Sequence, residues 1–229
     1  MDGNVLIVGA GPGLSASLAK KFKAEGMDVA LAARNTDKLT KMCSEADVQA
    51  FKCDATKVDD VCRLFDQLQE QHLTPDVVVY NAGYRVPSCF VDLDPQDVQN
   101  ALQVNAFGAM LVAQAAAKAM LDKGQGSILF TGASAGVKGY ANSAAFAMGK
   151  FALRGLCQSL ARELAPQNIH VAHIIIDGLI QNNERGVPFN DPDKTLNPDE
   201  IANTYYALSN QDKSAWTWEL ELRPSVEIF

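Results

Sequence analysis

Residues 4–15 read NVLIVGAGPGLS, and this stretch decides the fold. A short apolar run leads into a turn with glycine at positions 9, 11 and 13, and a helical pattern follows the turn. Glycine lets the backbone turn sharply, and the N–H groups at the start of a helix attract anions. The order of strand, glycine turn and helix predicts an α/β domain with a phosphate-binding turn. A purely structural turn is the weaker alternative.

Apolar runs and helical periodicity alternate along the rest of the chain. Connections of helix length between apolar runs predict a parallel sheet with helices on both faces. The expected fold class is an α/β, three-layer, doubly wound Rossmann fold with a mostly parallel sheet of about seven strands. We expect one domain over residues 1–229. The expected strands are residues 4–8, 28–33, 48–53, 76–80, 127–131, 169–176 and 218–224, and the expected helices are residues 14–25, 36–46, 58–71, 95–122, 142–164 and 198–209.

Composition excludes several classes of partner. The chain has 229 residues, of which 48% are hydrophobic and 21% charged, enough apolar material for a core. A formal net charge of -7 disfavours nucleic acid or an anionic membrane as a main partner. No apolar run reaches about 18 residues, so no membrane span is expected. The N-terminus lacks the basic region and cleavage pattern of a signal peptide.

The cysteines and histidines predict neither disulfides nor a metal site. The 5 cysteines are irregularly spaced and form no CxxC, which is typical of free thiols in a reducing compartment, so we expect a cytoplasmic protein. His170 and His173 lie three apart in a strand-like run and therefore point to opposite faces. We interpret both histidines as structural.

The end of the second expected strand bears on cofactor choice. A carboxylate usually stands there when the ligand has a free ribose 2′-hydroxyl. Residues 32–35 read AARN, with no carboxylate and with Arg34 available for a 2′-phosphate. The sequence therefore favours NADP(H) over NAD(H). The alternative is that Arg34 is merely a solvent-exposed side chain.

A second stretch, residues 126–150, carries candidate chemistry. It reads GSILFTGASAGVKGYANSAAFAMGK, a strand, a loop of small residues and the start of a long helix. Phe146 and Lys150 are four apart, so they share one helix face. Lys150 is a useful cation in an active site, but Phe146 has no proton to donate.

From Val5 to about Gly178 the chain resembles the short-chain dehydrogenase/reductase family. The matching motifs are the glycine turn, Asp54 after the third strand, NAG at residues 81–83, Asn105 within VNAFG, and Lys150. Ser15 stands where the family usually has its last glycine, and Asp177 precedes Gly178 where the family usually has proline. The resemblance implies a cofactor site made of Gly9, Gly11, Pro12, Gly13, Leu14, Ser15, Arg34, Asp54, Asn81, Ala82, Gly83, Lys150 and Gly178.

The resemblance also implies a catalytic site, and here the chain departs from the family. Family members use a tyrosine four residues before the lysine as general acid and base, and the lysine lowers the pKa of that tyrosine. A serine in the preceding loop holds the substrate oxygen, and the asparagine fixes a water chain. In this chain Phe146 occupies the tyrosine position. The catalytic candidates are therefore Lys150, Asn105 and Ser134.

The hydroxyl groups near Phe146 leave the proton donor unassigned. An ungapped alignment places Ala133 at the family's serine position, with Ser134 next to it. Ser143 and Tyr140 are further candidates, neither in register with the usual tyrosine. Loss of a general acid costs roughly 10²–10⁴ in rate. Two hypotheses follow: an NADP(H)-dependent oxidoreductase acting on an unknown carbonyl or alcohol, or an NADP(H)-binding pseudoenzyme that serves as a redox sensor or scaffold.

The C-terminal part predicts a substrate-covering loop and an interface. Residues 181–197 are polar and contain Val187 and Phe189, and we expect a loop there. The small-molecule substrate is not identified. Family resemblance implies a homodimer or homotetramer, in which the helices that begin near Asn100 and Asn142 pair. Trp216, Trp218 and Phe229 pack either against a neighbouring subunit or over their own core.

Overall fold

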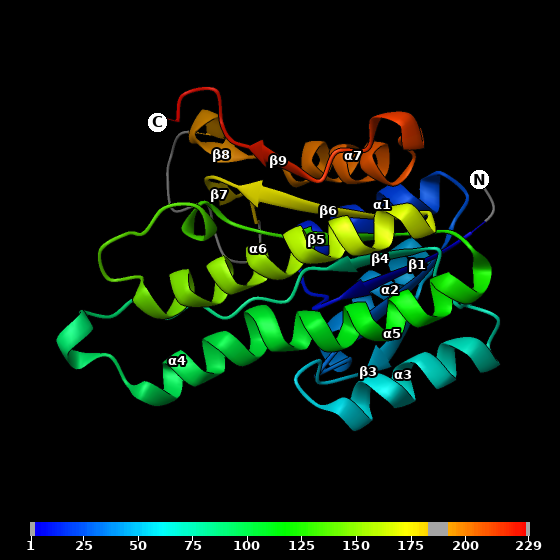
Figure 1. Ribbon diagram of the computed structural model, residues 1–229, viewed down its shortest axis with the longest axis horizontal. Helices are drawn as coiled ribbons and strands as arrows, with labels where there is room; N and C mark the ends of the chain where they lie inside the picture. The colour runs from blue at the N-terminus through cyan, green and yellow to red at the C-terminus, as the bar shows by residue number, and fades with distance from the viewer. Residues whose placement is uncertain (1–2, 183–191, 228–229) are drawn as a thin grey trace.

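The chain folds around a seven-stranded sheet in which every strand pairs in parallel with its neighbours. The structure, a computed structural model, describes residues 3–182 and 192–227. The strand order is β3-β2-β1-β4-β5-β6-β9, and the chain reverses direction across the sheet between β1 and β4 (Figure 1). The strands are β1 (Asn4–Val8), β2 (Asp28–Ala33), β3 (Gln49–Lys52), β4 (Val77–Tyr80), β5 (Gly126–Thr131), β6 (Ile169–Ile176) and β9 (Glu219–Leu222). The expected doubly wound α/β fold is confirmed.

Helices cover both faces of the sheet. One face is packed by α3, α5 and α6, which lie in front of the sheet in Figure 1, and the other by α1, α2 and α7. The shorter α4 packs against α6. The helices are α1 (Leu14–Ala24), α2 (Thr40–Ala46), α3 (Val58–Glu70), α4 (Pro95–Leu102), α5 (Gly108–Lys123), α6 (Ala144–Leu164) and α7 (Pro198–Ser209).

Strand periodicity explains the two cores. Leu6 and Val8 face the core under α3, α5 and α6, whereas Val5 and Ile7 face the core under α1 and α7. Side chains of a strand alternate between the faces, so a strand covered on both sides must be apolar throughout. β6 shows this over its whole length, since all eight of its residues are buried. The continuous apolar runs of the sequence therefore mark central strands.

The helix expected over residues 95–122 is divided into three parts. A π-helical turn, Gln103–Phe107, separates α4 from α5. The Tyr80 hydroxyl donates a 2.6 Å hydrogen bond to the Val104 carbonyl inside this turn. Gly108 makes room for that hydroxyl, because a Cβ at position 108 would lie 2.6 Å from it. The expected long helix is confirmed as the continuous helical stretch Pro95–Lys123, whereas the π turn inside it was not predicted. The Tyr80 contact lies at this turn, as tertiary contacts do at many π-bulges.

The loop expected over residues 181–197 is not wholly irregular. Pro192–Lys194 form a 3₁₀ turn, and β8 (Thr195–Leu196) pairs in parallel with β7 (Leu179–Ile180). Both residues of β8 are buried. The sequence did not predict this strand, because it stands in a polar segment and its pairing partner lies outside that segment. Val187 and Phe189 lie outside the described residues.

Smaller differences concern the ends of elements. Residues 36–46 form a 3₁₀ turn, Asp37–Leu39, before α2, and the helix expected from residue 142 begins at Ala144. β9 lies at the sheet edge next to β6, as its alternating pattern predicted. Trp216 stacks on its own chain's His170 with ring centroids 4.9 Å apart, while Trp218 is 36% exposed. Phe229 lies outside the described residues.

Among the described residues, Pro95–Lys123 is the one helical stretch long and apolar enough to cross a membrane by length and composition. It packs against α3, α6 and β4, and 44% of its most apolar part is buried in the fold. A core helix of this kind passes the same test as a membrane span. The expectation of no membrane span stays a prediction.

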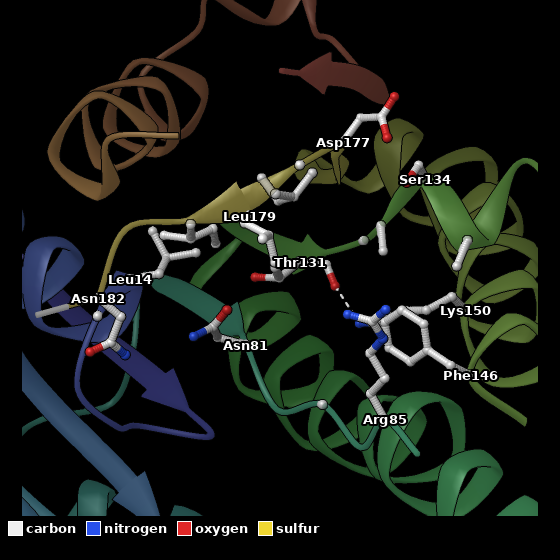
Figure 2. A pocket seen from close by; sticks show the side chains of 18 of the residues that line it. Leu14, Asn81, Arg85, Thr131, Ser134, Phe146, Lys150, Asp177, Leu179 and Asn182 are labelled. Atoms are coloured by element: carbon white, nitrogen blue, oxygen red, sulfur yellow. Dashed lines mark hydrogen bonds between the residues drawn. The ribbon is translucent and has the colours of Figure 1, made fainter. Parts of the chain in front are cut away.

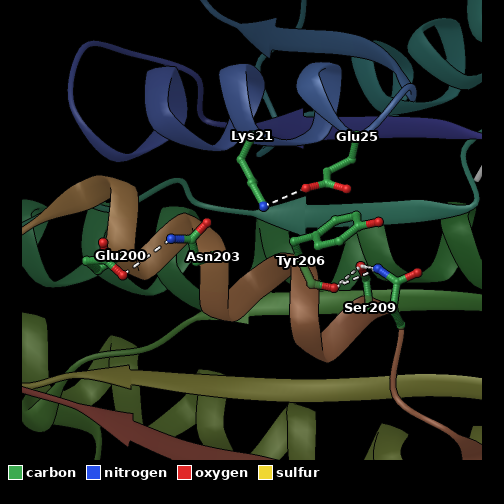
Figure 3. Close-up of polar contacts among 7 residues, drawn as sticks. Lys21, Glu25, Glu200, Asn203, Tyr206 and Ser209 are labelled. Atoms are coloured by element: carbon green, nitrogen blue, oxygen red, sulfur yellow. Dashed lines mark hydrogen bonds and ion pairs between the residues drawn. The ribbon is translucent and has the colours of Figure 1, made fainter.

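The last helix, α7, lies along the first helix, α1 (Figure 3). Tyr206 of α7 packs edge-on against Phe22 at 5.8 Å between ring centroids, and the Lys21 ammonium lies 4.9 Å from the same Tyr206 ring. Lys21 also pairs with Glu25 at 2.7 Å. These contacts anchor the helix that follows the glycine turn.

Candidate active site

A cleft of about 1150 Å³ opens at the carboxyl ends of β1, β4, β5 and β6. It lies where the strand order reverses between β1 and β4, the place where open α/β sheets bind ligands. Most of the predicted site residues line it. They are Gly9, Gly11, Pro12, Gly13, Leu14, Ser15, Asn81, Gly83, Ser134, Phe146, Lys150 and Gly178.

The glycine turn forms one end of the cleft, beside Leu14 and Asn182 in Figure 2. Gly9 and Gly13 have φ of 82° and 98°, a backbone conformation that other residues rarely adopt. A Cβ at Gly9 would also collide with the Ala82 backbone. Nothing stands within 4 Å of the position that a Cβ would take at Gly11, so this face of the turn is open. The turn therefore forms an open cradle whose shape requires glycine, which has no side chain, at these positions.

The N-terminus of α1 points its backbone toward this cradle. Among the described residues no side chain caps it, and its first turn contains no acidic residue. The first N–H groups of a helix lack partners within the helix and favour an anion. These features fit the pyrophosphate of a dinucleotide.

The Ser15 hydroxyl stabilises the glycine turn through hydrogen bonds. Ser15 is 1% exposed, and its Oγ accepts a 2.8 Å hydrogen bond from the Asn81 amide. The same hydroxyl lies 3.5 Å from the Gly9 carbonyl. Asn81 thus ties the end of β4 to the turn after β1. This contact gives both residues a structural role in addition to any contact with a ligand.

Lys150 lies at the other end of the cleft as a buried cation. It is 4% exposed, and its Nζ donates a 2.8 Å hydrogen bond to the Thr131 carbonyl (dashed in Figure 2). It forms no ion pair with any described residue. Burial lowers the pKa of Lys150 to about 8, because the charged form loses its hydration.

The Phe146 ring stands beside Lys150 and also beside an arginine. The Lys150 ammonium is 5.7 Å from the ring centroid, and the guanidinium carbon of Arg85 is 5.8 Å from the same centroid. Both distances are typical of cation–π contacts. Figure 2 shows Arg85 and Phe146 together at this end of the cleft. The i, i+4 relation predicted for Phe146 and Lys150 is confirmed on α6.

Asn105 lies behind this end of the cleft and does not line it. It is fully buried, accepts a hydrogen bond from the Tyr84 N–H (3.1 Å) and donates one to the Tyr84 carbonyl (2.9 Å). The Tyr84 hydroxyl in turn donates to Asp97 at 2.6 Å, and this bond raises the pKa of Tyr84. Asn105 therefore holds the loop after β4. Its expected water-chain role stays a prediction, since both amide atoms already have partners.

Three other predicted residues also lie beyond the residues that line the cleft. Arg34 follows β2 and is exposed, and its guanidinium makes no ion pair with any described residue. Asp54 follows β3, and its carboxylate accepts hydrogen bonds from the N–H (3.1 Å) and hydroxyl (2.7 Å) of Thr56. Ala82 packs against Gly9. Arg34 and Asp54 thus follow β2 and β3, the strands on the far side of β1 from β4.

The candidate hydroxyls occupy different parts of the cleft wall. Ser134 and Ala133 follow β5, and in Figure 2 Ser134 is drawn on the side of Asp177, away from Phe146. Ser143 is buried immediately before α6 and lines the cleft. Tyr140 is 45% exposed at the rim, with the Lys138 ammonium 5.6 Å from its ring. None of these positions coincides with the Phe146 ring.

Comparison with known proteins gives the family. The sequence pattern of the short chain dehydrogenases matches residues 3–183. The chain belongs to the short-chain dehydrogenase family. By family it is an oxidoreductase of the short-chain dehydrogenase type, a class that binds nicotinamide cofactors.

Relatives of this short-chain dehydrogenase include enzymes and solved structures. A 3-oxoacyl-[acyl-carrier-protein] reductase of Mus musculus is 32% identical over 184 residues, which cover 79% of this chain and 77% of the relative. A short-chain dehydrogenase structure from Rhodopseudomonas palustris is 34% identical, with a TM-score of 0.83 and coverage of 96% of this chain and 98% of that one. A metagenomic short-chain oxidoreductase solved in complex with NADP is 26% identical, with a TM-score of 0.85 and coverage of 99% of each chain.

The site of this short-chain dehydrogenase contains residues that the sequence did not single out. Arg85 is the most prominent, because it adds a cation to the wall opposite the glycine turn. Asn182 donates a 3.2 Å hydrogen bond to the Pro12 carbonyl and so covers the glycine turn from the C-terminal half. A charged residue two positions after the NAG motif was the available signal for Arg85. For Asn182 the sequence offers no signal, since the contact spans 170 positions.

Proposed function

We propose that this chain is an NADP(H)-dependent oxidoreductase that acts on a small carbonyl compound or alcohol. The observation that carries the proposal is the single cleft that holds the glycine cradle at one end and buried Lys150 at the other. A bound nicotinamide would supply or accept hydride there.

The residues of the chain divide the work along the cleft. The turn of residues 9–13 and the N-terminus of α1 would hold the pyrophosphate, with Asn81 bracing the turn. Lys150 would hold the nicotinamide ribose by its ammonium, whose place is set by the Thr131 carbonyl. Ser134 is the proposed hydroxyl for the substrate oxygen, and Asn105 positions the loop that carries Tyr84 and Arg85.

The preference for NADP(H) rests on Arg34. Its exposed guanidinium at the end of β2 suits a 2′-phosphate by charge and by its planar donor geometry, and residues 32–35 contain no carboxylate that would repel one. The solved relative with bound NADP supports the same choice. Arg34, Asp54 and Ala82 would then contact the adenosine half of the cofactor or support it.

The alternative is an NADP(H)-binding pseudoenzyme that works as a redox sensor or scaffold. It is favoured by one observation: a phenyl ring, with no proton to donate, lines the cleft beside Lys150. No other hydroxyl lies in its place among the described residues. The glycine cradle does not depend on Phe146, so the cofactor would bind in either case.

Cofactor titration tests the proposal. NADPH and NADH are titrated by nucleotide fluorescence against the wild type, Arg34→Ala and the control Lys213→Ala, which removes an exposed charge far from the cleft. We expect tight NADPH binding, weaker NADH binding, and loss of most of that difference in Arg34→Ala alone. Equal affinity for both nucleotides in the wild type would refute the Arg34 argument. Turnover on a panel of carbonyl compounds then separates the oxidoreductase from the pseudoenzyme.

We also propose that the chain is a cytoplasmic homodimer or homotetramer forming one domain. Support comes from apolar side chains exposed on and beside α5 and α6, namely Phe107, Leu121, Met148 and Phe151. All 5 cysteines are free in the structure.

A further inference from the structure

Arg85 is a cation at the end of the cleft that holds Phe146 and Lys150, here called the substrate end, and no acidic side chain among the described residues pairs with it. It is exposed, lines the cleft, and forms no ion pair with any described residue. Its contact among the described residues is with the ring of Phe146. The five N–H donors of its guanidinium are therefore available to a ligand in the cleft.

The position of Arg85 is set by its neighbour. Asn105 holds both backbone polar groups of Tyr84, and the Tyr84 hydroxyl is bonded to Asp97 on α4. Three hydrogen bonds therefore fix the residue immediately before Arg85. Such bracing fixes the backbone from which the Arg85 side chain projects into the cleft, which lowers the entropic cost of binding a ligand there.

Arg85 does not lie at the end of the cleft that would hold the cofactor phosphates. In Figure 2 the glycine-turn end, marked by Leu14 and Asn182, lies opposite the end that holds Arg85, Phe146 and Lys150. The free guanidinium therefore faces the region left for substrate.

The overall charge makes this local cation significant. The chain carries a formal net charge of -7, which disfavours the approach of anions in general. Arg85 and Lys150 lie 5.8 Å and 5.7 Å from one ring centroid, so the substrate end has a concentrated positive field. A guanidinium binds carboxylate or phosphate through two parallel hydrogen bonds.

We propose that Arg85 forms a subsite for an anionic group of the substrate, so that this site takes short carbonyl compounds that carry a carboxylate or phosphate. The inference rests on the proposed oxidoreductase function and specifies its substrate class. Because both cations lie within 5.8 Å of one ring centroid, an anionic group bound to Arg85 would lie at the same end of the cleft as Lys150, which favours a short substrate. Phe146 would provide an apolar surface for the carbon atoms of the substrate that lie between its anionic group and its carbonyl group.

Calorimetric titration of the protein saturated with NADP⁺, which has no hydride to transfer to a carbonyl group, tests the subsite with matched probes. The carboxylate pair is 2-oxobutanoate and its methyl ester, and the phosphate pair is dihydroxyacetone phosphate and dihydroxyacetone. The variants are Arg85→Met, which keeps an unbranched stem over Phe146, Arg85→Lys, which keeps the charge, and Arg162→Met, which removes the same charge from the exposed far end of α6. The anionic member of at least one pair should bind about tenfold tighter than its neutral partner, the expected scale for a charge-assisted bidentate contact. The pair that shows the preference identifies the anion.

Arg85→Met should erase that preference, Arg85→Lys should retain part of it, and Arg162→Met should retain all of it. Equal binding of anionic and neutral probes by the wild type, or an unchanged preference in Arg85→Met, would overturn the subsite. Repeating the titrations without nucleotide separates the two proposals. An anion preference that persists in a protein unable to bind NADPH supports the subsite and refutes the cofactor proposal, whereas NADPH binding without any anion preference does the reverse.

Discussion

Lys150 is a buried ammonium that donates its hydrogen bond to the neutral Thr131 carbonyl. Below about pH 8 it is protonated in both the folded and unfolded chain, and the folded state bears the cost of a buried charge, up to about 3 kcal/mol. Between about pH 8 and the ordinary value of 10.5 the unfolded chain binds a proton that the folded chain has lost. The cost therefore falls as the pH rises through this window.

Replacing Lys150 with methionine should stabilise the protein without cofactor at pH 7. We expect a gain of about 1–3 kcal/mol in the free energy of unfolding, because the apolar side chain removes the buried charge, partly offset by the lost hydrogen bond to Thr131. The gain should shrink at pH 10. Urea unfolding of the wild type, Lys150→Met and the exposed control Lys118→Met at both pH values measures it. A gain of equal size at pH 7 and pH 10 would argue against the pKa assignment.

Phe146 is the residue whose chemistry separates the two proposed functions. Phe146→Tyr would place a phenol next to Lys150 without disturbing the ring contacts. If the rest of the site is intact, carbonyl reduction should increase by about 10² or more, the lower end of what a positioned general acid contributes. The measurement is NADPH oxidation on a panel of carbonyl compounds, with Phe146→Leu as the control for loss of the aromatic ring.

No gain in Phe146→Tyr on any compound would show that the catalytic defect extends beyond this side chain. An equal gain in Phe146→Leu would show that relief of crowding, and not the hydroxyl, causes the effect.

At the scale of elements, the site depends on how closely α6 approaches α4. Gly149 on α6 allows the contact, because a Cβ there would lie 2.8 Å from both the Ala101 carbonyl oxygen and the Asn105 amide nitrogen. The carbonyl is helix backbone and has little freedom to move. Gly155, six residues later on the same helix, has nothing within 4 Å of its Cβ position.

The two glycines of α6 should therefore respond oppositely to alanine. Gly149→Ala should destabilise the protein by about 1–3 kcal/mol through overpacking. Gly155→Ala should stabilise it by about 0.5–1 kcal/mol, since alanine has the higher helix propensity. Chemical denaturation of both variants gives the two values. Changes of the same sign would mean that α6 does not press on α4 as closely as the structure indicates.

At the scale of the molecule, the exposed apolar residues on and beside α5 and α6 bear on assembly. If these helices pair between subunits, the wild type should sediment as a dimer or tetramer. Phe151→Glu should then shift the mass toward the monomer, because an ionised carboxylate would be buried in the interface. Val58→Glu, an equally exposed apolar position at the start of α3, is the control. A wild type that sediments as a monomer at all concentrations would exclude the assembly.

Sequence alone determined the layers of this protein and most of its cleft. Runs of apolar residues require a sheet covered on both faces, and helical periodicity between them requires parallel pairing. Because parallel strands end at one edge, the residues after β1, β4 and β5 had to meet there. The glycine turn, the NAG motif and Lys150 were accordingly found in one cleft.

Tertiary structure alone decided the features that depend on contacts between distant segments. The π turn exists because Tyr80 reaches the Val104 carbonyl, β8 because Leu179–Ile180 offers an edge, and the Arg85 contact because α6 brings Phe146 beneath the loop after β4. Each contact joins residues whose separation along the chain is unrelated to any helix or strand period. Local patterns predict which face of an element is buried, but only packing determines which side chain from another element lies against it.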